Sequence, residues 1–203
     1  MFNAHPLVNR SLVRWSLATS VACITFASVP SPTLALSGFT GDFDPGNWSL
    51  NNSNADGFVD TTNAASGAIN LFGGDNSSFS SGNTDWTTTA TNTFAVSFDW
   101  NYSSLDIDGQ DTAGYLLNSV YNVLASADGE FSTSPVSFTV NPGDTFGFRV
   151  FTVDNSGGSG VLSVSNFNAE PVPFEFSPIL GLSIFGLNGL YRVWRKQKLN
   201  NLN

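Results

Sequence analysis

The sequence predicts an all-β domain between residues 36 and 170, folded as an antiparallel β-sandwich of the jelly-roll kind. Two observations lead to this expectation. Apolar residues alternate with polar ones in several short runs, whereas the period of an amphipathic helix is nearly absent. Clusters of Gly, Asn, Asp and Pro separate these runs, as turns separate the strands of a sandwich.

Three segments have the strongest strand pattern. In 93–102, large apolar and aromatic residues from Phe94 to Tyr102 share one face, and small or polar residues share the other. Segment 136–140 alternates in the same way. In 145–153 both faces have apolar residues, which predicts a central strand.

Weaker strand patterns lie at 48–51, 68–72, 86–90, 114–118, 121–125 and 161–167. With the three strong segments they predict roughly eight to ten short strands. Residues 169–172 are expected to form a short linker after the last strand, because this stretch contains Pro171 and leads to Pro173.

Residues 1–35 have the pattern of a secretory signal peptide. Arg10 and Arg14 precede an apolar run over 15–29, which is followed by a proline-rich break. Thr33 and Ala35 are small residues at the −3 and −1 positions of a signal peptidase site, so cleavage is expected after Ala35. The alternative is a permanent anchor helix, but the run is shorter than the ~20 residues that a membrane span needs.

The C-terminal segment has three parts in a fixed order. A linker and polar motif occupy 171–178, an apolar run at 179–194 predicts a transmembrane helix, and 195–203 is a basic tail expected in the cytoplasm. The motif consists of Pro173, Phe174, Glu175, Phe176, Ser177 and Pro178. The basic residues that end the run are Arg192, Arg195, Lys196 and Lys198.

This order of motif, apolar run and basic stop resembles the PEP-CTERM sorting signals of bacterial exosortase substrates. It is closest to the variant with Pro-Phe-Glu in place of Pro-Glu-Pro that accompanies cyanobacterial-type exosortases. The resemblance covers residues 172–198, and it implies processing by a membrane-embedded cysteine peptidase. It also implies a final location anchored at the cell envelope or released into the extracellular polysaccharide matrix. Segments 41–48, 96–102, 114–118 and 143–150 resemble the CUB-like or jelly-roll ectodomains common among such proteins.

The composition of residues 36–172 excludes several classes of function. Fifteen of the 16 carboxylates of the chain lie in 36–172 with a single base, Arg149, and this stretch has no lysine, histidine, cysteine or methionine. Its net charge of −14 excludes nucleic-acid binding, and the missing residue types exclude disulfides, zinc sites and His-dependent nucleophiles. A glycosidase needs only two carboxylates, but Glu130 follows the turn residues Asp128 and Gly129, so an enzyme is not expected.

Three aspartates suggest a possible calcium site. Asp106, Asp108 and Asp111 are closely spaced around Gly109, directly after the strongest strand pattern. Ca²⁺ binds six to eight hard oxygen atoms, and loops of this type supply several of them. The alternative is a hairpin loop whose aspartates cap backbone amides.

Two further hypotheses concern aromatic and basic side chains. Trp48 and Trp86 lie near turn-rich segments and are the candidates for an exposed platform that stacks on sugar rings. Arg149 lies on a strand with apolar neighbours, so it is expected to pair with an aspartate, Asp99 or Asp144.

Taken together, these features predict an exported, non-enzymatic surface or extracellular-matrix protein that is sorted by an exosortase-type system. The alternative is a secreted carbohydrate- or calcium-binding β-sandwich module that attaches to exopolysaccharide. The expected partners are signal peptidase, an exosortase-type peptidase and, for the alternative, a polysaccharide.

Overall fold

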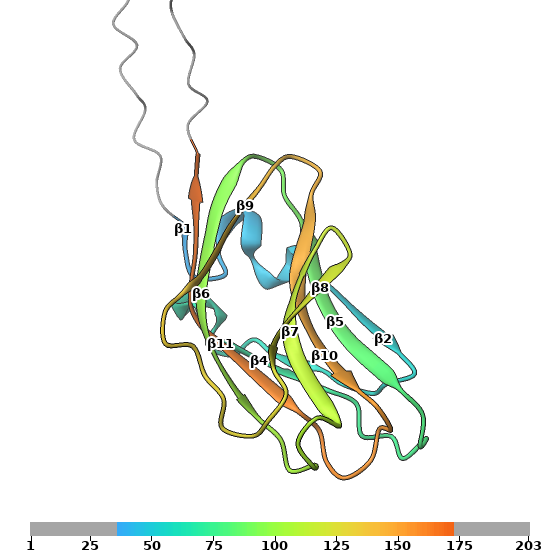
Figure 1. The fold of residues 1–203 in the computed structure, drawn as a ribbon. Coiled ribbons are helices and arrows are strands. Elements are labelled where there is room, and N and C mark those ends of the chain that lie inside the picture. Colours follow the sequence, from blue (N-terminus) through green and yellow to red (C-terminus); the bar gives the residue numbers. More distant parts are fainter. Residues whose placement is uncertain (1–35, 173–203) are drawn as a thin grey trace, which may run out of the picture. The chain divides into compact units, whose positions relative to one another are not determined.

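A computed structural model describes residues 36–172, and these residues form two antiparallel sheets packed face to face (Figure 1). The expected signal peptide, sorting motif, transmembrane helix and basic tail lie outside the described residues. Within residues 36–172, no helix has the length and apolar character needed to cross a membrane. The prediction of an all-β domain is confirmed.

One sheet has six strands and the other has five. The order of the first is β3-β4-β11-β6-β9, with β1 beside the second half of β11, and the order of the second is β2-β5-β10-β7-β8. The first comprises β1 (Leu36–Ser37), β3 (Val59–Asp60), β4 (Ile69–Phe72), β6 (Phe94–Ser103), β9 (Val136–Val140) and β11 (Val161–Pro171). The second comprises β2 (Ser49–Ser53), β5 (Gly82–Thr89), β7 (Asp111–Leu117), β8 (Val120–Ala125) and β10 (Thr145–Thr152).

The chain crosses repeatedly between the sheets. From β4 to β11, each connection leads to the opposite sheet except the hairpin between β7 and β8. Three short 3-10 helices, η1 (Gly41–Phe43), η2 (Pro45–Asn47) and η3 (Ala64–Ser66), lie in the connections before β2 and β4. Strands far apart in the sequence therefore become neighbours in each sheet.

The strongest sequence patterns mark strands as expected. In β6, Phe94, Val96, Phe98 and Tyr102 are buried, whereas most of the residues between them are at least partly exposed. β10 is the middle strand of its sheet, because β5 pairs with one edge and β7 with the other. Alternation with period two places the apolar residues of both sheets between the layers, which excludes water from one common core.

The expected linker at 169–172 is wrong for most of its length. β11 continues to Pro171, and Ala169 is fully buried opposite Val96 of β6. A register shift between Ser165 and Asn168 separates the two halves of this strand, and Asn166 there has a φ of 50°. Such a bulge lets one long strand keep its apolar side chains on the core face after a bend.

Aromatic rings fill the end of the core near η1. Phe39 stacks on Phe167 with ring centroids 4.1 Å apart, and Phe43 meets Phe94 edge to face at 4.9 Å. Edge-to-face and offset-stacked pairs contribute beyond the area that they bury. The segment between β1 and β2 thus seals the sandwich with side chains rather than with regular structure.

Candidate functional site

The two tryptophans expected at the surface belong to the core. Trp48 is 7% exposed and Trp86 is 2% exposed, and their rings stack with centroids 4.2 Å apart. The indole N–H of Trp48 donates a hydrogen bond to the carbonyl of Phe43 at 3.0 Å. The prediction of an exposed Trp48–Trp86 platform is therefore wrong: Trp86 is on the core face of β5, and Trp48, which follows η2, packs on it inside the sandwich.

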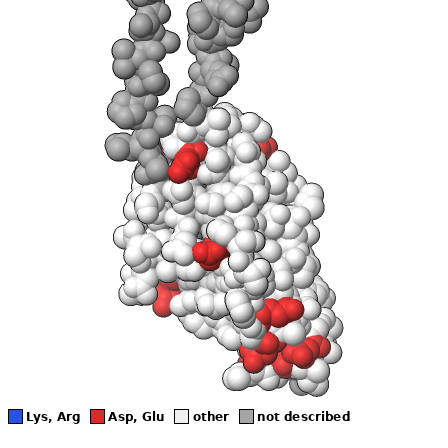
Figure 2. Space-filling view, turned by 60° about the vertical axis from the view of Figure 1, so that its left-hand side comes forward, with Lys and Arg blue, Asp and Glu red and all other residues white. Residues whose placement is uncertain are grey.

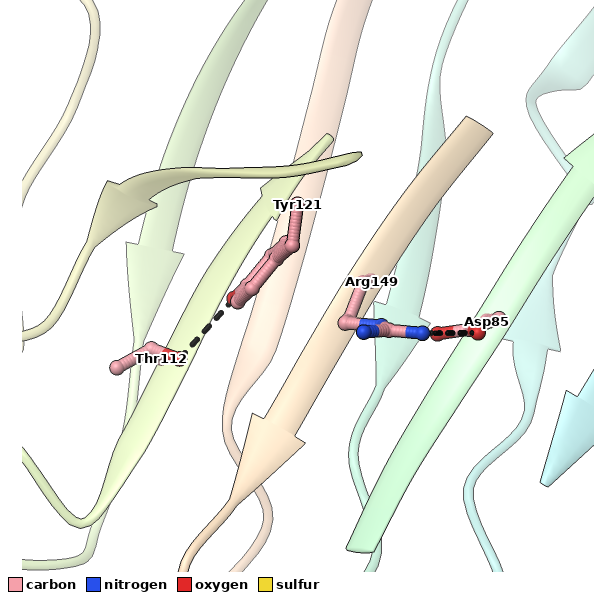
Figure 3. Close-up of polar contacts among 4 residues, drawn as sticks. All are labelled: Asp85, Thr112, Tyr121 and Arg149. Atoms are coloured by element: carbon pink, nitrogen blue, oxygen red, sulfur yellow. Dashed lines mark hydrogen bonds and ion pairs between the residues drawn. The ribbon is translucent and has the colours of Figure 1, made fainter. Parts of the chain in front are cut away.

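A polar pair lies instead on the outer face of the five-stranded sheet. Arg149 of β10 and Asp85 of β5 are direct cross-strand partners, so their side chains leave the sheet on the same face (Figure 3). The Nε and Nη2 atoms of Arg149 donate to Oδ1 and Oδ2 of Asp85, each at 2.6 Å. The expected ion pair of Arg149 is confirmed, but its partner is Asp85 and not Asp99 or Asp144.

An aromatic ring on β8, beyond β7 in the same sheet, supports this pair. The guanidinium carbon of Arg149 lies 5.3 Å from the centre of the Tyr121 ring, within reach of a cation–π interaction. The Tyr121 hydroxyl shares a hydrogen bond with the Thr112 hydroxyl at 3.0 Å (Figure 3). The arginine is therefore fixed in one orientation by contacts on β5 and β8.

Burial and pairing change the acidity of these groups. The hydrogen bonds to Asp85 raise the pKa of the Arg149 guanidinium above its usual value, although burial acts in the opposite direction. Burial raises the pKa of the Tyr121 phenol to about 12. Both side chains therefore keep their protons at neutral pH, and neither acts as a base there.

One hollow borders this pair, and a second lies next to the first. The first has a volume of about 190 Å³ and is lined by Asp85, Thr87, Leu116, Ser119, Thr145 and Arg149. The second, of about 380 Å³, is lined by Asp42, Asn47, Ser49, Thr87, Thr88, Thr89, Thr91 and Thr145. They share Thr87 and Thr145, so they lie side by side, and together they are called the outer groove below. Most of the residues that line it are serines and threonines.

Some of these hydroxyl groups are already used within the domain. Thr91 donates to the Asp42 carboxylate at 2.6 Å, and Thr88 donates to the Asn47 carbonyl at 2.9 Å. Among the described residues, the hydroxyls of Thr87 and Thr145 have no hydrogen-bond partner. They are free to bond to a ligand in the outer groove.

The three aspartates of the expected calcium loop do not gather at one point. The Asp108 carboxylate accepts a hydrogen bond from the amide of Asp128 at 3.1 Å, whereas Asp111 accepts one from the Ser104 hydroxyl at 3.3 Å. Asp106 accepts from the amide of Ile107 at 2.7 Å. In the described part of the chain, no three acidic side chains come close enough together to hold a metal ion.

The outer groove was missed by sequence reasoning. Asp85 lies in a mostly polar run and Tyr121 in a mostly apolar one, and nothing in the local sequence of either residue indicates a site. The one available signal was Arg149, because a lone base on a strand requires an acidic partner. The register between β5 and β10 decided which of the carboxylates it would be.

No protein-family model and no curated protein matches the sequence. Among solved structures, the family 11 carbohydrate-binding module of a Clostridium thermocellum cellulosomal cellulase is 10% identical in sequence to this chain. The alignment covers 71% of this chain and 97% of the module, with a TM-score of 0.39. The N-terminal cellulose-binding domain of Cellulomonas fimi β-1,4-glucanase C is 14% identical, covering 71% and 99%, with a TM-score of 0.33. Similarity this low assigns neither a family nor an activity.

Proposed function

We propose that this chain is an exported, non-enzymatic β-sandwich protein that attaches to neutral polysaccharide through the outer groove. The observation that carries the proposal is the Arg149–Asp85 pair, held rigid beside free hydroxyl groups on an open sheet face. Planar, fixed polar groups next to a shallow hollow suit the hydroxyl-rich surface of a sugar chain. The strand order supports the jelly-roll assignment.

The charge of the domain favours a neutral ligand over an acidic one. Arg149 is the sole base in residues 36–172, and Asp85 already neutralises it. Acidic side chains also gather at one end of the face seen in Figure 2, where no basic side chain is in view and which is therefore not the face of Arg149. The net charge of −14 in residues 36–172 would repel a uronate or sulfate polymer, whereas it would not repel an uncharged glycan.

The arrangement of carboxylates supports binding rather than hydrolysis. Asp85 is held by Arg149, and Asp42 accepts a hydrogen bond from Thr91. Glu130 accepts hydrogen bonds from the amides of Ser126 and Ala127 at 2.7 and 3.1 Å. Each of these carboxylates therefore has a structural partner, which leaves little scope for the acid and base that glycoside hydrolysis requires.

The location outside the cell is supported by the sequence at both ends. The expected signal peptide directs export, and the motif Pro173–Pro178 with its apolar run and basic stop resembles an exosortase sorting signal. A polysaccharide-binding domain would then retain the protein in the envelope or the extracellular matrix after processing.

The test is affinity electrophoresis and calorimetry of the protein with soluble neutral β-glucan, galactan and mannan, and with alginate as an anionic polymer. We expect binding to at least one neutral polymer, no binding to alginate, and no release of reducing ends. Thr87→Val, which removes a free groove hydroxyl, should weaken binding about fivefold, since one hydrogen bond contributes about 1 kcal/mol.

The matched control is Thr139→Val. Thr139 lies in a hollow of about 400 Å³ on the outer face of the other sheet, so this variant should bind like the unaltered protein. Binding to alginate alone, or equal weakening by both variants, would contradict the assignment of the outer groove.

A further inference from the structure

Three buried oxygen atoms at one end of the sandwich have no hydrogen-bond partner within the described chain. They are Oη of Tyr102, Oδ2 of Asp106 and Oδ1 of Asp111. Tyr102 and Asp111 are each only 2% exposed. A buried polar group without a partner costs free energy, and a buried carboxylate costs more than a neutral group.

The fold brings these side chains to one place. Tyr102 lies near the end of β6, and Asp111 begins β7 opposite Thr152 of β10. The Ser104 hydroxyl joins the two acids, since it accepts from the Asp106 amide at 3.1 Å and donates to Oδ2 of Asp111 at 3.3 Å. The two sheets and the connection between β6 and β7 all contribute to the cluster.

The connection between β10 and β11 closes the cluster from the other side. A Cβ atom on Gly160 would lie 2.5 Å from the Tyr102 hydroxyl and 3.2 Å from Cβ of Asp111. A Cβ atom on Gly157 would lie 2.5 Å from Oδ1 of Asp106. Because both residues are glycines, the backbone of this connection can approach the side chains of Tyr102, Asp106 and Asp111 closely, and a larger residue at either position would collide with them.

No protein cation balances the two charges. Arg149 is the one basic side chain in residues 36–172, and both Asp85 oxygens hold it on the outer face of the sheet. A positive charge is the missing component of this cluster.

We propose that Asp106 and Asp111 together bind a divalent cation, Ca²⁺, between the β6–β7 and β10–β11 connections. Ca²⁺ accepts irregular sets of oxygen ligands, including hydroxyls, backbone carbonyls and water, whereas Mg²⁺ demands a near-ideal octahedron. Ser104 and Tyr102 supply the nearest neutral oxygens. Asp108 is not a ligand, because its carboxylate is directed to the amide of Asp128. The ion would fasten two connections that otherwise meet through few bonds, independently of any polysaccharide.

The test compares thermal unfolding in EDTA, in CaCl₂ and in MgCl₂ at millimolar concentration for the protein and for Asp106→Asn, Asp111→Asn and Asp108→Asn. We expect Ca²⁺ to raise the Tm of the unaltered protein by about 5 °C, and Mg²⁺ to raise it less. Asp108→Asn should keep this rise, and the other two variants should lose it. Calorimetric titration of the unaltered protein should give one site per chain, a measurement that does not depend on whether a variant folds.

Three results would overturn the proposal. The first is a Tm of the unaltered protein that does not respond to Ca²⁺, together with no heat of binding. The second is an Asp108→Asn variant that loses the response as fully as Asp111→Asn does. The third is an Asp111→Asn variant whose Tm still rises with Ca²⁺ as much as that of the unaltered protein, because Asp111 would then not be a ligand.

Discussion

The Arg149–Asp85 pair allows a quantitative test by a double-mutant cycle of Asp85→Leu, Arg149→Leu and the two together. The two parallel hydrogen bonds are both charge-assisted, and the side chains are 24% and 12% exposed. Exposed ion pairs contribute about 0.2–1 kcal/mol, and loss of one partner of a fully buried pair costs about 3–5 kcal/mol. An intermediate burial predicts a coupling free energy of about 2 kcal/mol.

Each single variant leaves one charge half-buried without its partner, so each should lose about 2 kcal/mol of unfolding free energy, or roughly 8 °C in Tm. The double variant should also lose about 2 kcal/mol, rather than the about 4 kcal/mol of two independent sites, because it leaves no unpaired charge and its two leucines pack against each other on adjacent strands. Urea unfolding followed by tryptophan fluorescence is the suitable assay, since Trp48 and Trp86 are stacked in the core.

A coupling free energy below about 0.5 kcal/mol would refute this reasoning, because the bidentate geometry would then contribute no more than an ordinary surface pair. The same would follow if the double variant were as unstable as the sum of the two single variants. In either case the rigid orientation of Arg149, on which the outer groove depends, would lose its support.

Two further predictions concern pH and processing. The pKa of Tyr121 rises from 10.0 in the unfolded chain to about 12 in the fold. The stabilisation that the protonated phenol provides is therefore complete below pH 10 and is lost as the pH rises from 10 to 12. Tyr121→Phe should flatten this part of the curve of unfolding free energy against pH, measured by urea unfolding. Intact mass spectrometry of protein recovered from the envelope and matrix of producing cells should show an N-terminus at Leu36 and loss of the basic C-terminal tail, whereas an unprocessed chain in the soluble cytosol would contradict export.

Much of the fold follows from local sequence patterns. The alternation in 93–102 and 136–140 marked β6 and β9, because a strand places every second side chain on one face whatever surrounds it. The two-residue strands β1 and β3 had no such signal, since two residues cannot show a period. Their pairing depends on partners in β11 and β4, which lie elsewhere in the chain.

Aromatic residues were harder to place. Trp48 and Trp86 are flanked by polar and turn-forming residues, which predicted exposure, yet both rings lie in the core. The local sequence does not show that Trp48, which follows η2, stacks on Trp86 inside the sandwich. Burial of a side chain near a turn depends on where the turn packs, and only the assembled layers decide that.

The sequence by itself determined the periodicity of the strands, the charge of −14 in residues 36–172 and the limited chemistry available to a domain with one base. These properties depend on composition and on the order of neighbouring residues alone. The tertiary structure decided which carboxylate holds Arg149 and which groups the aspartates of the 106–111 loop accept hydrogen bonds from. Asp85 and Arg149 are separated by 64 positions in the chain. The register of β5 against β10 brings them together, and register is set by the packing of both sheets on their common core.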